Sequence, residues 1–333
     1  MAFRPHRKAE NALCGHLTRK NFPAALLSLI DGDEVGMKPA SKRDIAFVFQ
    51  MLALYPHMNV RKNISYPLIS QGMTREEVSK RMAEVARIRR IEHIIDKPVG
   101  GLSGGDRQRA ALGRAIVRQP KAFFMDEPLG ELDAEFREHM AEELRALHDC
   151  MGATTVYVTH DQLGAMQMGD KIVVMHHGVV EQFGKPQQIY DWPATKFVVQ
   201  FIGSSSMNFL DFEGVIGIGG DGVDLAGVRL AVPSVREGRA GRLTLGVRPE
   251  HVKFRDDAAY RGRVTAVEYL GTTQILTLST GHGDLKARIS SGYKVREEEL
   301  VGLDFDARTL TLFDADNGKA LVSEANEGVL GNG

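Results

Sequence analysis

The sequence predicts two domains: an α/β domain in the N-terminal part and a small all-β barrel in the C-terminal part. The α/β prediction rests on residues 101–128, where a glycine-rich turn, a helical segment and a short apolar strand follow one another. The all-β prediction rests on short alternating strands, separated by turn residues, beyond residue 206. At 333 residues the chain is long enough for both domains.

Composition and charge exclude several classes of protein. Lys and Arg number 42 against 43 Asp and Glu, so the net charge of -1 provides no global basic field, and we expect no nucleic-acid partner. No apolar run approaches the length of a bilayer span. Two cysteines, Cys14 and Cys150, offer neither a disulfide framework nor a metal cluster, and the polar, basic N-terminus has no secretory signal. These features predict a cytoplasmic protein.

A glycine-rich turn at Ser103, Gly104 and Gly105 opens the central stretch. Its glycines let the backbone approach a ligand closely. The segment 107–118 that follows has helical composition, so the turn is expected at a helix N-terminus. Free N–H groups and the helix dipole attract anions to such an end, phosphate above all.

The apolar strand 122–125 delivers two adjacent carboxylates, Asp126 and Glu127. Its continuous apolar character is typical of a parallel strand buried on both faces. An aspartate at the C-terminal end of such a strand is well placed to hold Mg²⁺, and the following glutamate can orient a water molecule.

Together, LSGGD at 102–106 and FFMDEP at 123–128 resemble the signature and Walker B motifs of ABC-type transport ATPases. Gln50 resembles the family's Q-loop glutamine, Asp133 its D-loop aspartate and His160 its switch histidine, in the family's order and at its spacings. The resemblance implies a P-loop NTPase-like ABC ATPase domain.

The same resemblance implies the roles of the site residues and two cofactors, ATP and Mg²⁺. Asp126 and Gln50 would hold the metal ion, and Glu127 would orient or deprotonate the attacking water. Gln50 and His160 would contact the water and the γ-phosphate. Nucleotide binding would fall to Ser103, Gly104, Gly105 and Asp133, with the signature turn acting on the ATP of a partner subunit.

The N-terminal side departs from the family pattern. A strand and the P-loop, G-x-x-x-x-G-K-[ST], should precede residue 30, and the chain does not contain that pattern. We therefore expect an ATPase domain that is incomplete at its N-terminus. The expected organisation is an unmatched segment at 1–25, the ABC ATPase domain at 26–205, and the OB-like accessory domain at 206–333. Asp106 also departs from the glutamine that is usual in the signature.

Two C-terminal stretches resemble the carbohydrate and glycerol-phosphate importers, of which the maltose importer is one: FIGSSSMNFL at 201–210 and GVRPEHV at 246–252. The resemblance implies an ATP-binding subunit that couples ATP hydrolysis to uptake of a sugar or sugar-like solute. Its implied partners are transmembrane permease subunits, a second ATPase subunit in a homo- or heterodimer and, indirectly, a solute-binding protein. Its implied location is the inner face of the cell membrane, as a peripheral protein.

Two alternative functions remain at this stage. The chain could be a non-catalytic subunit that supplies only its signature motif to an intact ATPase. It could also be a regulatory protein that binds through its C-terminal barrel. In either case the absent P-loop predicts that a homodimer of this chain hydrolyses ATP slowly or not at all.

Overall fold

A computed structural model describes residues 2–3, 29–30, 32–39, 42–130, 134–203, 206–225 and 227–330. The chain forms two compact units. Unit 1 comprises Met1–Asp170 and Met175–Val179, and unit 2 comprises Lys171–Val174 and Val180–Gly333. Most of the segment 1–25 and also Asp133 therefore lie outside the described residues.

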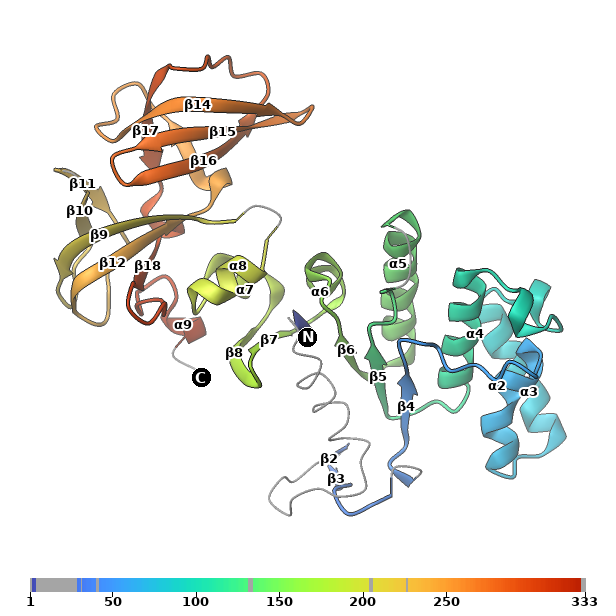
Figure 1. Cartoon of the computed structure of the whole chain (residues 1–333). Helices are drawn as coiled ribbons and strands as arrows, with labels where there is room; N and C mark the ends of the chain where they lie inside the picture. Colours follow the sequence, from blue (N-terminus) through green and yellow to red (C-terminus); the bar gives the residue numbers. More distant parts are fainter. Residues whose placement is uncertain are drawn as a thin grey trace. The chain divides into compact units, whose positions relative to one another are not determined.

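The centre of unit 1 is a three-stranded parallel sheet in the order β4-β5-β6 (Figure 1). Its strands are β4 (Ile45–Val48), β5 (Ala122–Asp126) and β6 (Thr154–Val158). The first four side chains of β5 are buried, as expected for a central parallel strand covered on both faces. The strand predicted at 122–125 is confirmed, and parallel pairing places the carboxyl ends of all three strands at one edge of the sheet.

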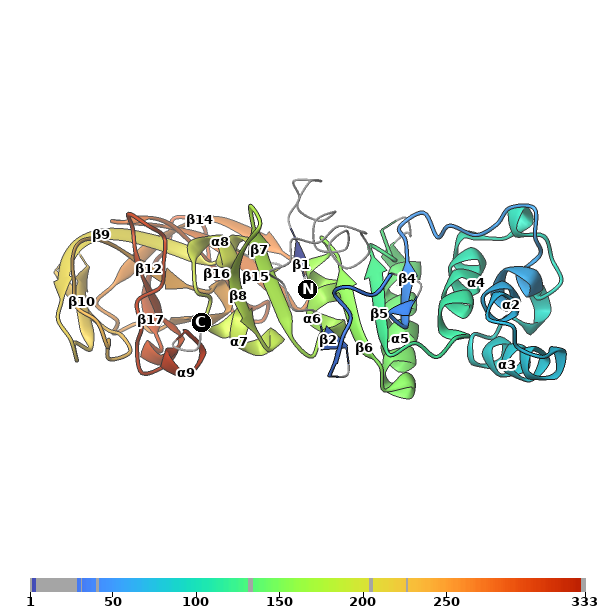
Figure 2. The same cartoon turned by 90° about the horizontal axis from the view of Figure 1, so that it is seen from below.

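The helices of unit 1 fall into two groups (Figures 1 and 2). α2 (Val60–Ser70), α3 (Arg75–Ile88) and α4 (Gly104–Ile116) pack against one another, and α5 (Ala134–Met151) packs against α6 (Gln162–Met168). Thr74 and Glu77 form a capping box at the start of α3. The short elements of this unit are β1 (Ala2–Phe3), β2 (Leu29–Ile30), β3 (Asp33–Glu34), η2 (Glu92–Ile94) and η3 (Val99–Gly101).

Apart from β7, which both units share, unit 2 is mainly antiparallel β structure. One sheet has the order β18-β12-β9, a second has the order β13-β17-β14-β15-β16, and β10 and β11 form a hairpin. The strands are β7 (Ile172–His176), β8 (Val179–Gly184), β9 (Asn208–Ile216), β10 (Gly222–Leu225), β11 (Val228–Ala231), β12 (Arg239–Val247), β13 (Val252–Phe254), β14 (Arg261–Tyr269), β15 (Thr273–Thr280), β16 (Gly283–Ser290), β17 (Leu300–Phe305) and β18 (Thr311–Asp314). The expected all-β character is confirmed, and inward-facing aliphatic side chains from both sheets form one core.

Arg248, in the GVRPEHV stretch, holds the helical segment before β9 against this β structure. Its side chain is 1% exposed and donates two hydrogen bonds to the carbonyl oxygen of Tyr190, at 2.7 and 3.2 Å. A third donor reaches the carbonyl of Ile202 at 3.5 Å, and the guanidinium lies 3.6 Å from the centre of the Tyr190 ring. The segment contains α7 (Pro186–Asp191) and α8 (Lys196–Phe201). The remaining helical elements are η4 (Pro249–His251), η5 (Ala307–Thr309) and α9 (Glu327–Leu330).

A second buried polar side chain, Asn208, links the two sheets of unit 2. Its amide donates to the carbonyl oxygens of Val247 and Lys286 at 3.1 and 2.8 Å, and its side-chain oxygen accepts from the Lys286 backbone N–H. One side chain thus binds three backbone groups, one on β12 and two on β16.

The two units divide the chain earlier than residue 205, the boundary expected between the domains. Residues 180–203 belong to unit 2, because α7 and α8 pack on the β structure through Arg248. A compact unit and a family domain need not share a boundary, and the boundaries at 25 and 205 stay predictions. Within the described ranges, none of the helices combines the length and the apolar character that crossing a bilayer requires.

Candidate functional site

The three strands of the parallel sheet bring the separated motif residues to one edge. Gln50 follows β4, Asp126 ends β5 and is followed by Glu127, and His160 follows β6 by two residues. Because the strands are parallel neighbours, their carboxyl ends lie together, where open α/β sheets bind ligands. Residues far apart in the sequence therefore form one cluster.

Glu127 is the centre of this cluster. Its Oε1 lies 2.7 Å from Nδ1 of His160, and its Oε2 accepts a hydrogen bond of 3.4 Å from the Gln50 side-chain amide. An ionised carboxylate can only accept, so Nδ1 of His160 carries the proton and Nε2 is left for another partner. The Glu127 side chain is 15% exposed and that of His160 is 57% exposed, so the cluster is open to solvent on the histidine side.

The backbone at Glu127 is held in an uncommon conformation. Its φ is +42°, in the left-handed region that non-glycine residues rarely adopt. The N–H of Glu127 donates to the carbonyl of Val158 at 2.9 Å, and its carbonyl accepts from the N–H of Gly130 at 3.1 Å. These two bonds fix a conformation that costs about 1–3 kcal/mol, and such costs concentrate at functional sites.

Asp126 provides the chemistry that a divalent cation needs. Within the described part of the chain its carboxylate accepts no hydrogen bond and forms no ion pair. Burial, and to a smaller extent the neighbouring charge of Glu127, raises the pKa of Asp126. A cation would offset both effects. No group of three or more His, Cys, Asp or Glu among the described residues forms a complete metal cage. Mg²⁺ is commonly held by one or two carboxylates together with substrate phosphates and water, and the Asp126 carboxylate fits that donor set.

The signature turn begins α4, as expected. Ser103 is the N-cap residue, and its hydroxyl oxygen accepts from the backbone N–H of Asp106 at 3.2 Å. The N–H groups of Gly104 and Gly105 have no acceptor within the described residues. The first turn of α4 thus offers two backbone donors and the Ser103 hydroxyl proton to an anionic ligand.

Asp106, the departure from the family signature, has a local structural role. It occupies the first turn of α4, where a negative charge interacts favourably with the helix dipole. Its carboxylate lies 3.5 Å from the Arg109 guanidinium. Arg109 also pairs with Glu143 of α5 at 3.0 Å. The Asp106 charge is therefore partly neutralised within the chain.

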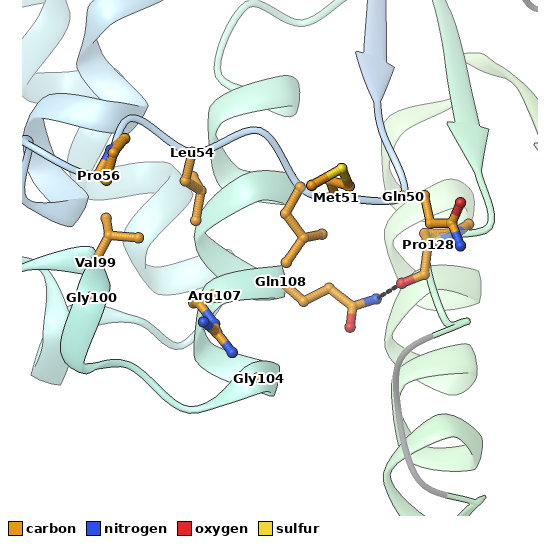
Figure 3. A pocket seen from close by; sticks show the side chains of 11 residues that line it. Gln50, Met51, Leu54, Pro56, Val99, Gly100, Gly104, Arg107, Gln108 and Pro128 are labelled. Atoms are coloured by element: carbon orange, nitrogen blue, oxygen red, sulfur yellow. Dashed lines mark hydrogen bonds between the residues drawn. The ribbon is translucent and has the colours of Figure 1, made fainter.

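A pocket of about 330 Å³ lies between the segment after Gln50 and the start of α4 (Figure 3). Gln108 of α4 reaches from its wall to the sheet edge, where its amide donates to the carbonyl of Pro128 at 2.6 Å (Figure 3). This buried bond connects the signature helix to the segment directly after the Walker B carboxylates. The lining residues are Gln50, Met51, Leu52, Leu54, Pro56, Val99, Gly100, Gly104, Arg107, Gln108 and Pro128.

Two contributing residues were missed by sequence reasoning, Gln108 and Arg114. Both lie within the helical segment after the signature, and composition does not distinguish them from the other polar residues of that segment. A partial signal existed for Gln108, because helical spacing places it on the buried side of α4 together with Ala110 and Ala111. No sequence signal indicated that Arg114 contacts the Q-loop.

The comparisons with family models agree with this architecture. The family model described as ABC transporter matches residues 12–130, and the one described as TOBE domain matches residues 245–313. The first match begins upstream of residue 26, where the resemblance was expected to start. An incomplete N-terminus stays a prediction.

Three relatives match nearly the whole chain. The sn-glycerol-3-phosphate import ATP-binding protein UgpC of Cereibacter sphaeroides is 42% identical over 318 residues, covering 92% of this chain and 89% of the relative. The trehalose/maltose import ATP-binding protein MalK of Thermococcus litoralis is 43% identical over 299 residues, covering 85% and 79%. The uncharacterized ABC transporter ATP-binding protein YurJ of Bacillus subtilis is 40% identical over 329 residues, covering 92% and 89%.

A solved structure supports the fold. CbiO1 of Clostridium perfringens, described as part of the ABC transporter complex CbiONQ, matches with a TM-score of 0.52 at 24% identity, covering 56% of this chain and 77% of that one. The fold class expected from the sequence is confirmed. On the strength of these similarities and of the motifs gathered at the sheet edge, the chain belongs to the family of ABC transporter ATP-binding proteins, with an ABC ATPase domain followed by a TOBE domain.

Proposed function

We propose that this chain is the ATP-binding subunit of an importer for a sugar or sugar-like solute, and that it couples ATP binding and hydrolysis to uptake. The observation that carries the proposal is the contact of Glu127 with both Gln50 and His160 at the carboxyl edge of the parallel sheet. The names of the relatives support the solute class, because UgpC, MalK and the trehalose import protein SugC of Mycobacterium tuberculosis are all import ATP-binding proteins.

We infer a step in hydrolysis for each residue of the cluster. Glu127 accepts a proton from the attacking water, and Gln50 and His160 hold its carboxylate in one orientation. The exposed face of His160 contacts the γ-phosphate of the substrate ATP. Asp126 and Gln50 would hold Mg²⁺, and the bound ion would neutralise charge on the phosphate oxygens.

The signature turn serves a second ATPase subunit, either another copy of this chain or a related one. Ser103, Gly104 and Gly105 face the phosphates of the ATP that the partner binds, with the free donors of the first turn of α4. Asp133 contributes to the same nucleotide site across the dimer.

The surface around the pocket between the segment after Gln50 and the start of α4 is the docking site for a transmembrane permease subunit. Met51 is 84% exposed and Phe49 is 50% exposed beside a pocket that contains Leu52 and Leu54. Exposed apolar side chains next to a concave surface are typical of a protein interface. Docking there places the chain peripherally on the inner face of the membrane, with the solute-binding protein contacting the permease from the other side.

ATP hydrolysis by the purified chain tests the site. Because the sequence has no G-x-x-x-x-G-K-[ST] pattern, we expect the homodimer to turn over ATP slowly or not at all. Phosphate release should be measured with and without Mg²⁺ for the wild type and Glu127→Gln. Magnesium-dependent turnover that Glu127→Gln abolishes would overturn the expectation of a weak homodimer and support the assigned base. Turnover that survives this substitution would overturn the site.

Solute uptake tests the cellular function. A strain lacking the gene should lose uptake of one labelled solute among glycerol 3-phosphate, trehalose and maltose, and the wild-type gene should restore it. Restoration by a Ser103→Arg variant as well would contradict a role of the signature turn. Unchanged uptake of every sugar-like solute in the deletion strain would contradict the proposed function.

A further inference from the structure

The segment after Gln50 contains a strained backbone. Leu52 and Ala53 are consecutive non-glycine residues with φ of +56° and +46°, both in the left-handed region. Neither is Asn or Asp, the residues that tolerate this region through local hydrogen bonds. Two such residues in succession persist only where the surrounding structure holds them.

Arg114 of α4 holds these two residues. Its Nη1 donates to the carbonyl oxygen of Ala53 at 2.7 Å, and its Nη2 donates to that of Leu52 at 3.0 Å. The planar guanidinium can bind two converging carbonyls at once, which an ammonium group cannot do with the same geometry. The hydrogen bonds end on the same two residues that carry the strain.

The charge of Arg114 has no carboxylate partner within the described residues. Burial lowers the pKa of Arg114, and the charge of the nearby Tyr55 hydroxyl opposes that effect to a smaller extent. The centre of the Tyr55 ring lies 5.3 Å from the guanidinium carbon, within the range of a cation–π contact. A part-buried cation without a carboxylate must be satisfied by dipoles. Among the described residues, the partners of this guanidinium all belong to the loop 52–55, so its interactions are directed to that loop.

The far end of the loop is anchored separately. The fully buried Asn63 of α2 accepts from the Tyr55 N–H at 2.8 Å and donates to the Tyr55 carbonyl at 3.1 Å. At the near end, Gln50 contacts Glu127. Arg114 therefore holds the middle of a loop whose ends are fixed by other elements.

We propose that Arg114 is a positioning residue that connects the signature helix to the Q-loop: it keeps Leu52 and Ala53 in the left-handed conformation and thereby keeps Gln50 on Glu127. The inference about the loop stands on the geometry alone, whereas its effect on hydrolysis rests on the proposed function. Movement of α4, which carries the signature turn, is transmitted to Gln50 through this side chain.

Hydrogen exchange of the full-length protein, followed by mass spectrometry, tests the link. In Arg114→Met, amides in peptides covering 50–56 should lose about tenfold protection or more, while those of α4 and β5 keep theirs. Arg114→Lys, which keeps the charge and one donor group, should show a loss of protection between those of the wild type and Arg114→Met. Arg87→Met is the matched control, because Arg87 is an exposed arginine on the neighbouring helix α3. Equal loss across α4 and β5 would show a merely structural role, and unchanged loop exchange would also overturn the proposal.

A double-mutant cycle isolates the strain. Ala53→Gly relieves it, since glycine adopts a positive φ without steric cost. In that background Arg114→Met should cost the loop clearly less protection than in the wild type, a non-additive result. Equal losses in both backgrounds would overturn the assignment of strain to Ala53.

Measurement of ATP hydrolysis separates this proposal from the proposed function. If the wild type hydrolyses ATP, Arg114→Met should lower kcat and leave KM for ATP nearly unchanged, because Arg114 acts through Gln50. A change confined to KM would contradict the positioning role. A wild-type homodimer without turnover is the result expected from the absent P-loop pattern, and in that case the exchange experiment decides the role of Arg114 by itself.

Discussion

Arg248 is predicted to carry a large share of the stability of unit 2. In Arg248→Met, the Tyr190 carbonyl loses both of its charged donors and the Ile202 carbonyl loses a weaker one. Charged hydrogen bonds contribute about 1.5–3 kcal/mol, and a desolvated cation over an aromatic ring adds about 2 kcal/mol. Release of the buried charge offsets part of this loss, because burial lowers the pKa of Arg248 and so disfavours its charged form. We expect the free energy of unfolding to fall by about 2–4 kcal/mol.

Urea unfolding followed by tryptophan fluorescence measures this effect in the right unit. Trp192 is the only tryptophan of the chain, and its indole N–H donates to the Ala325 carbonyl within unit 2. At a slope of about 2 kcal/mol per molar urea, the midpoint should shift down by about 1–2 M.

The matched control is Arg229→Met. Arg229 pairs with Asp221 at 3.2 Å on the surface of the same unit, with the two side chains 77% and 76% exposed. Loss of such a pair should change the free energy of unfolding by less than about 0.5 kcal/mol. An Arg248→Met midpoint indistinguishable from that of Arg229→Met would refute the reasoning.

Three further predictions concern the sheet edge and the core of unit 2. Asp126→Asn should stabilise unit 1 at neutral pH. The raised pKa of Asp126 in the folded state gives stability that is present at acidic pH and is lost as pH rises through that pKa. The amide of the variant removes this loss. Thermal unfolding between pH 4 and 8 should show a flatter profile for the variant, and an unchanged profile would contradict it. Asn208→Leu should lower the Trp192-detected stability by about 2–4 kcal/mol, since three buried backbone groups lose their partner; a loss below about 0.5 kcal/mol would contradict it. Gly246→Ala should cost about 1–3 kcal/mol in the same assay, because its Cβ would lie 2.6 Å from the Met207 sulfur and 2.8 Å from the Phe313 ring, and an unchanged midpoint would show that both side chains give way freely.

The sequence by itself determined some local elements and the motif residues of unit 1. The apolar strand at 122–125 and the capping box at Thr74 and Glu77 are local patterns, and local patterns are fixed by a few adjacent side chains. Motif order and spacing identified Gln50, Glu127 and His160 as one set. The spacing could not supply their arrangement. The two contacts of Glu127 arise from the parallel order β4-β5-β6, which brings Gln50 from 77 residues away and His160 from 33 residues away.

Tertiary structure alone decided the interactions that join distant segments. In the sequence Arg114 looks like an ordinary helical arginine and Arg248 like one polar residue in a β-rich stretch. In the structure Arg114 is half-buried and Arg248 is buried, and each donates to backbone carbonyls from another part of the chain. A carbonyl oxygen has no sequence signature, because every residue carries one. The partner of a buried guanidinium is therefore set by which loop the fold brings within 3 Å of it, and only the folded chain determines that.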